Sequence, residues 1–270
     1  MTLKNILVHL DQGERCRERL RLAVDLAQKH GARLVGLFAQ TSRADTVGVV
    51  AVWPPESYRD AAAASKAGFE AAAADIADAE WRDANRGSAQ EVVHAVIEAA
   101  HNVDLVVMGQ DAGGEHPQVP AGMAEQVILN AGRPVLVLPY VGRFESVGAR
   151  PLIAWNHSRE AARALNDALP LIANTEHAVV ASFVRHPDVE RAAARDCVAH
   201  LACHGVEASV EAMTPDGVGV MDMLLNRASD LGADLLVMGA HGQIGFPYLH
   251  RGAGSRHILA HMTLPVLMSH

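Results

Sequence analysis

A glycine-rich segment in the last quarter of the chain has residue types and spacing that suit phosphate binding. Gly239 and Gly242 follow an apolar run, and nine residues separate Gly242 from the run 252–255, which reads Gly-Ala-Gly-Ser. Glycine at the end of a strand lets the backbone approach a ligand closely. A Gly/Ser turn that enters a helix offers free N–H groups and the positive end of the helix dipole to an anion. Arg251 and Arg256 flank this turn and would add positive charge.

The same glycines have a simpler explanation, because they also permit turns in an alanine-rich α/β protein. The segment is not a Walker loop, since no Lys-Ser/Thr pair follows the glycines. It is not the dinucleotide fingerprint either, which follows the first strand of its fold. Spacing alone does not separate phosphate binding from simple turns, and a single glycine loop is weak evidence. Phosphate binding is therefore a hypothesis that needs support from the rest of the chain.

Other reactive side chains form no recognisable catalytic or metal motif. The fifteen histidines are scattered without an HExxH pattern, no Gly-x-Ser-x-Gly elbow is present, and Ser158 is better explained as a helix cap. Two cysteines and two histidines share one predicted helix: Cys197, His200, Cys203 and His204. They could form half of a zinc site or a redox pair, but a buried cysteine with histidine near a helix C-terminus is the simpler explanation. We expect no catalytic residue and no metal ligand.

The apolar run before Gly239 belongs to a repeat of domain size. Residues 104–109 (Asp-Leu-Val-Val-Met-Gly) recur as residues 234–239 (Asp-Leu-Leu-Val-Met-Gly), and each run is followed by a Pro-Val-Leu strand, at 134–137 and 265–268. A repeat of roughly 130–145 residues is a domain rather than a solenoid unit. Only the second copy keeps the spaced glycines, so we expect the two copies to differ in function.

Each copy alternates short apolar strands with helices, which requires a parallel sheet covered on both faces. Right-handed crossovers then give a doubly wound sandwich, in which ligands bind beyond the carboxyl ends of the strands. We expect an α/β protein of two tandem doubly wound α/β/α sandwich domains with parallel five-stranded sheets, residues 1–142 and 150–270. The final strands 135–138 and 266–268 should pair at a seam, because each would otherwise be an exposed edge.

One stretch of the first copy is harder to interpret. Residues 47–53 are apolar but end at Pro54-Pro55, which favours a loop. Residues 60–79 are rich in alanine and predict a helix, and residues 81–82 predict the centre of a short strand.

Composition narrows the class of protein. The chain has 270 residues, half of them hydrophobic, which is enough for two cores built from Val, Leu, Ile and Ala. The net charge of −8 and the absence of a long Lys/Arg run argue against a nucleic-acid partner. No signal-peptide pattern and no apolar stretch of membrane-spanning length is present, and three cysteines form no disulfide framework. We expect a cytoplasmic protein with reduced thiols and no membrane partner.

These features together carry a resemblance to a known family. The chain resembles the universal stress protein family in its tandem two-domain form. The features that carry the resemblance are the opening strand 6–11, the repeated Asp-Leu-x-Val-Met-Gly, the glycine spacing after residue 238 and the closing Pro-Val-Leu strands. The resemblance covers essentially the whole chain. It implies the adenine nucleotide alpha hydrolase-like fold. Many family members bind ATP or AMP, pair through their last strands and act in stress responses.

Carrying the family pattern over residue by residue gives different results for the two copies. An Asp that ends the first strand recognises adenine in the family; Asp11 fits that place in the first copy, and Asn156 stands there in the second. The amide oxygen of Asn156 can accept from the adenine amino group, without the strength that a charge adds. The family prefers Ser/Thr directly after the third glycine, where this chain has Ala253, and Ser255 matches a second hydroxyl position. The first copy lacks the nine-residue spacing, so we expect it to bind nothing comparable.

The resemblance therefore implies one nucleotide site, in the second copy. Its expected residues are Ala154, Asn156, Gly239, His241, Gly242, Arg251, Gly252, Ala253, Gly254 and Ser255. We expect a stress-response regulatory protein that binds ATP or AMP, with or without Mg²⁺. We expect no efficient catalysis. Expected partners are a second copy in a homodimer and a regulatory protein of unknown identity. A nucleotide-free interaction platform and a slow ATPase remain as alternatives.

Overall fold

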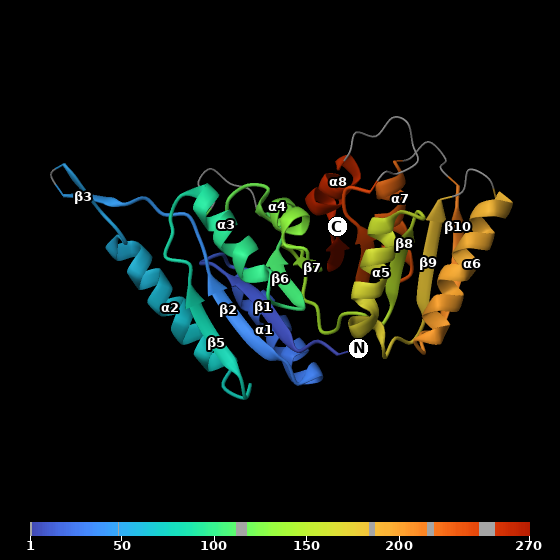
Figure 1. The fold of residues 1–270 in the computed structure, drawn as a ribbon, viewed down its shortest axis with the longest axis horizontal. Helices are drawn as coiled ribbons and strands as arrows, with labels where there is room; N and C mark the ends of the chain where they lie inside the picture. The colour runs from blue at the N-terminus through green and yellow to red at the C-terminus, as the bar shows by residue number, and fades with distance from the viewer. Residues whose placement is uncertain (1, 48, 112–117, 184–186, 215–218, 243–251) are drawn as a thin grey trace. The chain divides into compact units, whose positions relative to one another are not determined.

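The computed structural model describes residues 2–47, 49–111, 118–183, 187–214, 219–242 and 252–270. The chain divides into two compact units, Thr2–Val135 and Leu136–His270, which we call the first unit and the second unit (Figure 1). Both units are α/β structures with parallel sheets, so the predicted fold class is confirmed. None of the helices among the described residues is long and apolar enough to cross a membrane.

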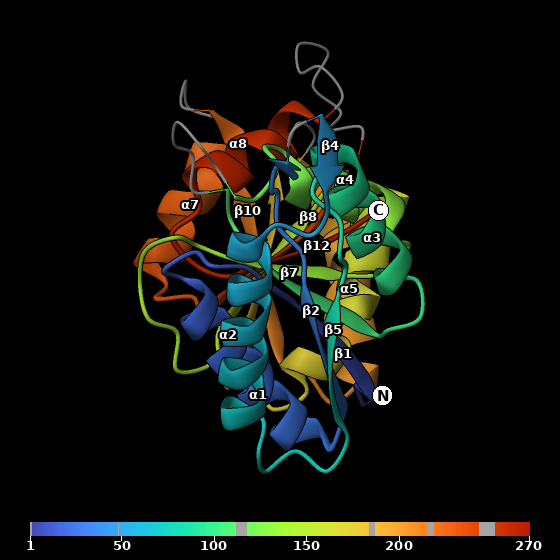
Figure 2. The same ribbon diagram turned by 90° about the vertical axis from the view of Figure 1, so that its left-hand side faces the viewer.

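The first unit alternates strands and helices in the order β1 (Asn5–Leu10), α1 (Cys16–His30), β2 (Arg33–Phe38), β3 (Asp45–Val47), β4 (Val50–Val52), α2 (Glu56–Ala72), β5 (Ala79–Asp83), α3 (Ala89–Ala100), β6 (Leu105–Gly109) and α4 (Met123–Asn130). Its main strands lie in the order β6-β1-β2-β5, and all pair in parallel. Right-handed crossovers place α1 and α2 on one face of these strands and α3 and α4 on the other, as Figure 2 shows.

The second unit contains β7 (Val135–Leu138), β8 (Pro151–Trp155), α5 (Arg159–Ile172), β9 (Ala178–Phe183), α6 (Pro187–Cys203), β10 (Ala208–Met213), α7 (Val220–Asp230), β11 (Leu235–Gly239), α8 (Ala253–His261) and β12 (Val266–Ser269). The strands lie in the order β10-β9-β8-β11-β12-β7. The boundary between the units falls inside β7, so residues 136–138 belong to the second unit, where β7 is the neighbour of β12. These are the two final strands that the sequence predicts to pair.

The central strands form the cores because they are apolar on both faces. The side chains of Ile6, Leu7 and Val8 in β1 are fully buried, and β7, β11 and β12 are equally well covered. Continuous rather than alternating hydrophobicity is what a parallel sheet with helices on both sides requires. Each fully buried Leu, Ile or Val contributes about 1.5–3 kcal/mol relative to an exposed one.

A repeated aspartate closes the amino edge of each sheet. In the first unit the Asp104 carboxylate accepts the backbone N–H groups of Lys4 and Asn5, at 2.7 and 3.0 Å. In the second unit Asp234 accepts those of Ala149 and Arg150, at 2.9 and 2.8 Å. Each carboxylate therefore satisfies backbone donors at the start of a strand, β1 in the first unit and β8 in the second.

The structure corrects the prediction of a loop over residues 47–53: of the described residues, Val47 and Val50–Val52 lie in two strands that pair antiparallel. Asp45 pairs with Val52 and Val47 with Val50, so β3 and β4 make a separate two-stranded sheet. Closely spaced β-branched valines favour extended backbone, and this preference outweighs the proline signal that follows. Helix α2 also starts and ends earlier than predicted. The strand predicted around residues 81–82 is confirmed as β5.

Candidate functional site

The expected site lies where the strand order of the second unit changes direction. From β8 the chain continues to β9 on one side, whereas from β11 it continues to β12 on the other. The carboxyl ends of β8 and β11 are neighbours, because these strands pair in parallel. Asn156 follows β8, and Gly239 is the last residue of β11. Doubly wound sheets bind ligands at the carboxyl edge of such a switch, and we call this edge the crevice of each unit.

Strand register shows which positions of the two units correspond. Leu105 of β6 pairs with Ile6, and its repeat equivalent Leu235 of β11 pairs with Pro151. Counting five residues forward from Ile6 and from Pro151 gives Asp11 and Asn156. These two residues therefore stand at equivalent places.

The loop that leaves β11 packs directly against the first turn of α5, which explains two of its glycines. A Cβ atom on Gly239 would lie 2.5 Å from the carbonyl carbon of Glu160, and one on Gly242 would lie 3.0 Å from Ser158 Oγ. Any side chain at Gly239 would push the loop away from the helix, and one at Gly242 would crowd Ser158. The loop is thus held at the crevice by close backbone approach.

The third glycine is required for a different reason. Gly252 is the N-cap of α8 in a left-handed conformation, with φ of 84°, and a Cβ there would overlap the His241 ring. The His241 N–H donates to the buried Ser255 Oγ at 2.9 Å, which ties the loop after β11 to the first turn of α8. The structure therefore brings together five of the expected residues: Gly239, His241, Gly242, Gly252 and Ser255.

The remaining expected residues are less closely connected. Ala154 is half-buried near the end of β8, Ala253 is the first residue of α8, and Gly254 is buried in its first turn. Arg256 is exposed on α8, and Arg251 lies outside the described residues. The helix α8 therefore contributes its first turn to the site, in addition to its N-cap.

Asn156 is used differently from what the sequence suggests. Its Oδ1 atom accepts hydrogen bonds from the N–H and the Oγ of Ser158, at 3.2 and 2.8 Å. Ser158 in turn caps α5 by accepting the N–H of Ala161. Since a carbonyl oxygen has two lone pairs, this oxygen has both of them engaged within the chain. The amide nitrogen of Asn156 is then the better placed group for a ligand, as a donor.

Sequence reasoning missed one carboxylate at this crevice, Glu160. Only 8 % of the residue is exposed, and its Oε2 would lie 3.3 Å from a Cβ on Gly242. Burial alone would raise the pKa of Glu160, but hydrogen bonding and charge from Arg159 hold that pKa below its usual value. The carboxylate is therefore ionised at neutral pH.

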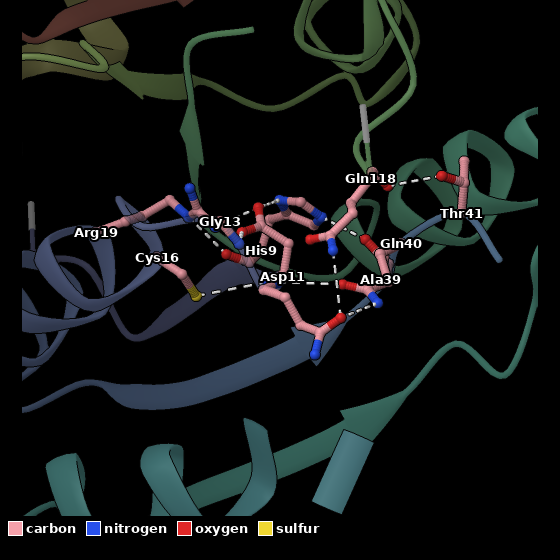
Figure 3. Close-up of polar contacts among 10 residues, drawn as sticks. His9, Asp11, Gly13, Cys16, Arg19, Ala39, Gln40, Thr41 and Gln118 are labelled. Carbon is pink, nitrogen blue, oxygen red and sulfur yellow. Dashed lines mark hydrogen bonds and ion pairs between the residues drawn. The ribbon is translucent and has the colours of Figure 1, made fainter. Parts of the chain in front are cut away.

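The equivalent crevice of the first unit holds side chains of its own (Figure 3). Asp11 accepts from Arg19 Nη2 at 2.7 Å and from the Gly13 N–H at 2.7 Å. Arg19 Nε also donates to the His9 carbonyl at 2.7 Å, and a Cβ on Gly109 would lie 2.5 Å from Arg19 Nη1. The guanidinium thus fills the space between the aspartate and the glycine that ends β6.

His9 and three glutamines complete this network. His9 Nε2 lies 2.7 Å from the Ala39 carbonyl, which makes this nitrogen the donor, and burial lowers the pKa of His9 to about 4 although Asp11 opposes the shift. The side chains of Gln12 and Gln40 bond each other, and Gln118 reaches Gln12 from the opposite loop (Figure 3). The chain itself therefore occupies the first crevice.

No group of three or more metal-ligating side chains comes together among the described residues.

Solved structures share this architecture. A universal stress protein from Archaeoglobus fulgidus DSM 4304 is similar with a TM-score of 0.71 at 20% identity, covering 98% of this chain and 95% of that one. A putative universal stress protein from Pseudomonas aeruginosa UCBPP-PA14 has a TM-score of 0.60 at 16% identity, covering 99% and 93%. At these identities the likeness establishes the fold. Curated proteins give no match.

The fold is that of a doubly wound α/β protein, and the candidate site lies at its strand switch. The model of the universal stress protein family matches residues 2–139, about half of the chain. The chain belongs to the universal stress protein family.

Proposed function

We propose that this protein is a stress-response regulator that binds an adenine nucleotide, ATP or AMP, in the second unit. The observation that carries the proposal is the contrast between the crevices. In the second unit three spaced glycines and the buried Ser255 gather at the carboxyl edge, whereas Arg19 fills the same place in the first unit. Backbone N–H groups at the start of α8 suit phosphate, since a helix N-terminus attracts anions.

The proposed orientation follows from the elements around the crevice. Phosphates lie near Gly242, Gly252 and the first turn of α8, and the base lies near Ala154 and Asn156. The Asn156 amide then donates to a ring nitrogen of the base, because its oxygen is held by Ser158. This is a weaker contact than one made by a carboxylate.

Calorimetry with ATP and AMP tests the site directly. Gly252→Val should abolish binding, because the new side chain displaces the His241 ring and enters the phosphate path. Gly122→Val is the matched control: Gly122 is the N-cap of α4 with φ of 72°, so it carries the same backbone strain, in the first unit. Unchanged ATP affinity in Gly252→Val would reject the site.

We propose that the bound nucleotide is sensed rather than turned over. Efficient phosphoryl transfer needs an oriented water, a base or orienting group, and usually a metal. Glu160 is a poor base, because its pKa is lowered. Phosphate release with ATP and Mg²⁺ should therefore stay far below the roughly 1–100 s⁻¹ of kinases. A turnover in that range, lost in Gly252→Val, would show that the protein is an enzyme.

An interaction platform is the second candidate, and the β3–β4 hairpin favours it. Val49 is 100% exposed and Val50 61% exposed, and exposed apolar side chains on a short hairpin suit contact with another protein. A homodimer or a regulatory partner in the cytoplasm would use this surface. Sedimentation of the wild type and of Val50→Thr tests it: a dimer that dissociates in the variant supports the platform, and a monomeric wild type removes the homodimer.

A further inference from the structure

The proposed function leaves open which purine the second crevice prefers, and the orientation of Asn156 provides evidence on this question. A side-chain amide has an oxygen that only accepts and a nitrogen that only donates, so its orientation determines what it can bind. The backbone N–H of Ser158 can only donate, and it lies 3.2 Å from Asn156 Oδ1. The amide therefore has its oxygen towards Ser158, and its nitrogen is the other branch of the side chain.

The Ser158 hydroxyl supports the same orientation. Its Oγ accepts the Ala161 N–H at 3.1 Å as the N-cap of α5, and it donates its own proton to Asn156 Oδ1 at 2.8 Å. A flipped amide would face both Ser158 donors with its N–H2 group and lose two hydrogen bonds within the chain. The orientation of Asn156 is thus set by contacts of the folded chain and not by a ligand.

The first unit shows what the second branch of this side chain meets. Asp11, at the equivalent place, makes the same turn, because its Oδ1 accepts the Gly13 N–H at 2.7 Å. Its other oxygen, Oδ2, accepts from Arg19 Nη2 at 2.7 Å (Figure 3). By this correspondence, the atom of the second unit that replaces Asp11 Oδ2 is Asn156 Nδ2. An acceptor is replaced by a donor at this place, so a ligand group that meets it must accept.

This donor suits the edge of guanine better than that of adenine. Adenine presents the N7 acceptor beside the 6-amino donor, and asparagine binds that edge with both its oxygen and its nitrogen. With Oδ1 held by Ser158, Asn156 can make only the bond to a ring nitrogen, and its N–H2 group then faces the adenine amino group. Guanine presents two acceptors, N7 and O6, on the same edge. The amide has two N–H donors, so neither of these acceptors is opposed by a like group.

The next residue of the loop also presents a donor. The Trp155 indole N–H donates to His157 Nδ1 at 3.0 Å, which places the proton of a neutral His157 ring on Nε2. His157 has φ of 61°, a left-handed conformation that is uncommon outside glycine. The equivalent positions of the first unit are Leu10 and Gln12, so the first unit has no such pair. Residues 156–159, Asn-His-Ser-Arg, contain no carboxylate that could accept from an adenine amino group.

We propose that the second crevice prefers 6-oxopurine nucleotides, those of guanine and hypoxanthine, to adenine nucleotides, because the Asn156 amide nitrogen donates to O6 of the base. This inference rests on the proposed function and names the base that the same site binds most tightly. Adenine nucleotides still bind, through a ring nitrogen, but with lower affinity. The phosphate contacts at the start of α8 are common to all of these ligands.

The test is calorimetry with ATP, GTP and ITP, the hypoxanthine nucleotide, in the wild type, Asn156→Asp and Asn166→Asp. ITP has O6 but lacks the 2-amino group of guanine, so it reports on the contact at position 6. Asn166 is exposed on α5, beyond its first turn, so Asn166→Asp is the control with the same change of charge in the same unit. We expect GTP and ITP to bind the wild type and Asn166→Asp about tenfold more tightly than ATP, as one good base contact provides.

Asn156→Asp should reverse this order. Its carboxylate accepts from the adenine 6-amino group and repels O6, so ATP should bind more tightly than GTP and ITP. The ratio of the affinities is the readout, because the added charge weakens the binding of every nucleotide phosphate. The variant is compatible with the fold, since Asp11 makes the same turn in the first unit. Asn156→Ala, which offers neither donor nor acceptor, should bring the ratio close to one.

ATP binding that equals or exceeds GTP and ITP binding in the wild type overturns this inference and leaves the proposed function intact. A preference for GTP and ITP that survives in both Asn156→Asp and Asn156→Ala also overturns it, because other residues would then select the base. Binding of GTP and ITP without any binding of ATP supports the inference and corrects the base named in the proposed function. Absence of binding by all three nucleotides and by AMP rejects the proposed function, and the inference with it.

Discussion

The two crevices have the same place in the fold but are lined by different side chains. The first unit keeps the aspartate at the end of its first strand, yet Asp11 is held by Arg19 and Gly13. The second unit has Asn156 at that place and keeps the glycine loop beside it. A residue that matches a binding motif can therefore remain in a chain for a structural reason. In the first unit Asp11 balances a buried arginine, which is sufficient cause to keep it.

The largest expected effect comes from breaking that buried pair. Arg19→Met should lower the free energy of unfolding by about 3–5 kcal/mol, because it leaves the Asp11 carboxylate buried without its partner. Urea denaturation followed by circular dichroism measures the change. Adding Asp11→Asn to Arg19→Met should recover part of the loss, since the uncompensated charge is then gone. A cost below about 1 kcal/mol for Arg19→Met would show that the pair does not hold the first crevice together.

Acid should destabilise the first unit through His9. Burial lowers the pKa of this imidazole to about 4, so between the ordinary histidine value and pH 4 the unfolded chain binds a proton that the folded chain does not. Stability is therefore fully present above about pH 6.5 and is lost as the pH falls towards 4, by roughly 3 kcal/mol. Denaturation midpoints across this range measure the slope. His9→Gln should flatten the slope, and an unchanged slope in that variant would assign the effect to other groups.

A smaller difference is expected between the two glycine N-caps. Gly252→Ala should destabilise the second unit by about 1–3 kcal/mol, because it adds a clash with the His241 ring to the strain of a positive φ. Gly122→Ala has similar strain but nothing within 4 Å of the new Cβ, so it should cost less. Thermal unfolding of both variants gives the comparison. Equal losses would mean that the His241 ring moves aside easily.

The smallest effect compares two serine caps. Ser158→Ala and Ser88→Ala each remove an N-cap hydrogen bond, which costs about 1 kcal/mol. Ser158 also holds the Asn156 amide oxygen, so only its replacement should change nucleotide affinity. Calorimetry distinguishes the two variants. Equal affinities would show that the Asn156 orientation does not matter for binding.

The sequence predicts the buried parallel strands well, because they are short apolar runs with few alternatives. It does not predict the contents of the crevices, which depend on contacts between separate elements. Arg19 has Leu22, Ala23 and Leu26 on the buried face of its helix, so an arginine in an apolar stripe was the available signal. Glu160 begins a similar row through Ala164 and Ala168. Neither pattern shows which partner the charged group meets.

The paired aspartates at the amino edge have a consequence for how such a chain changes over time. Asp104 and Asp234 bind equivalent backbone donors in both units. At the carboxyl edge the contacts differ: Asp11 binds Arg19 in the first unit, and Asn156 binds Ser158 in the second. Each sheet thus has a constant end and a permissive end. Substitutions that accumulate at the permissive end leave the strand register untouched, so two copies of one sequence can acquire different chemistry without a new fold.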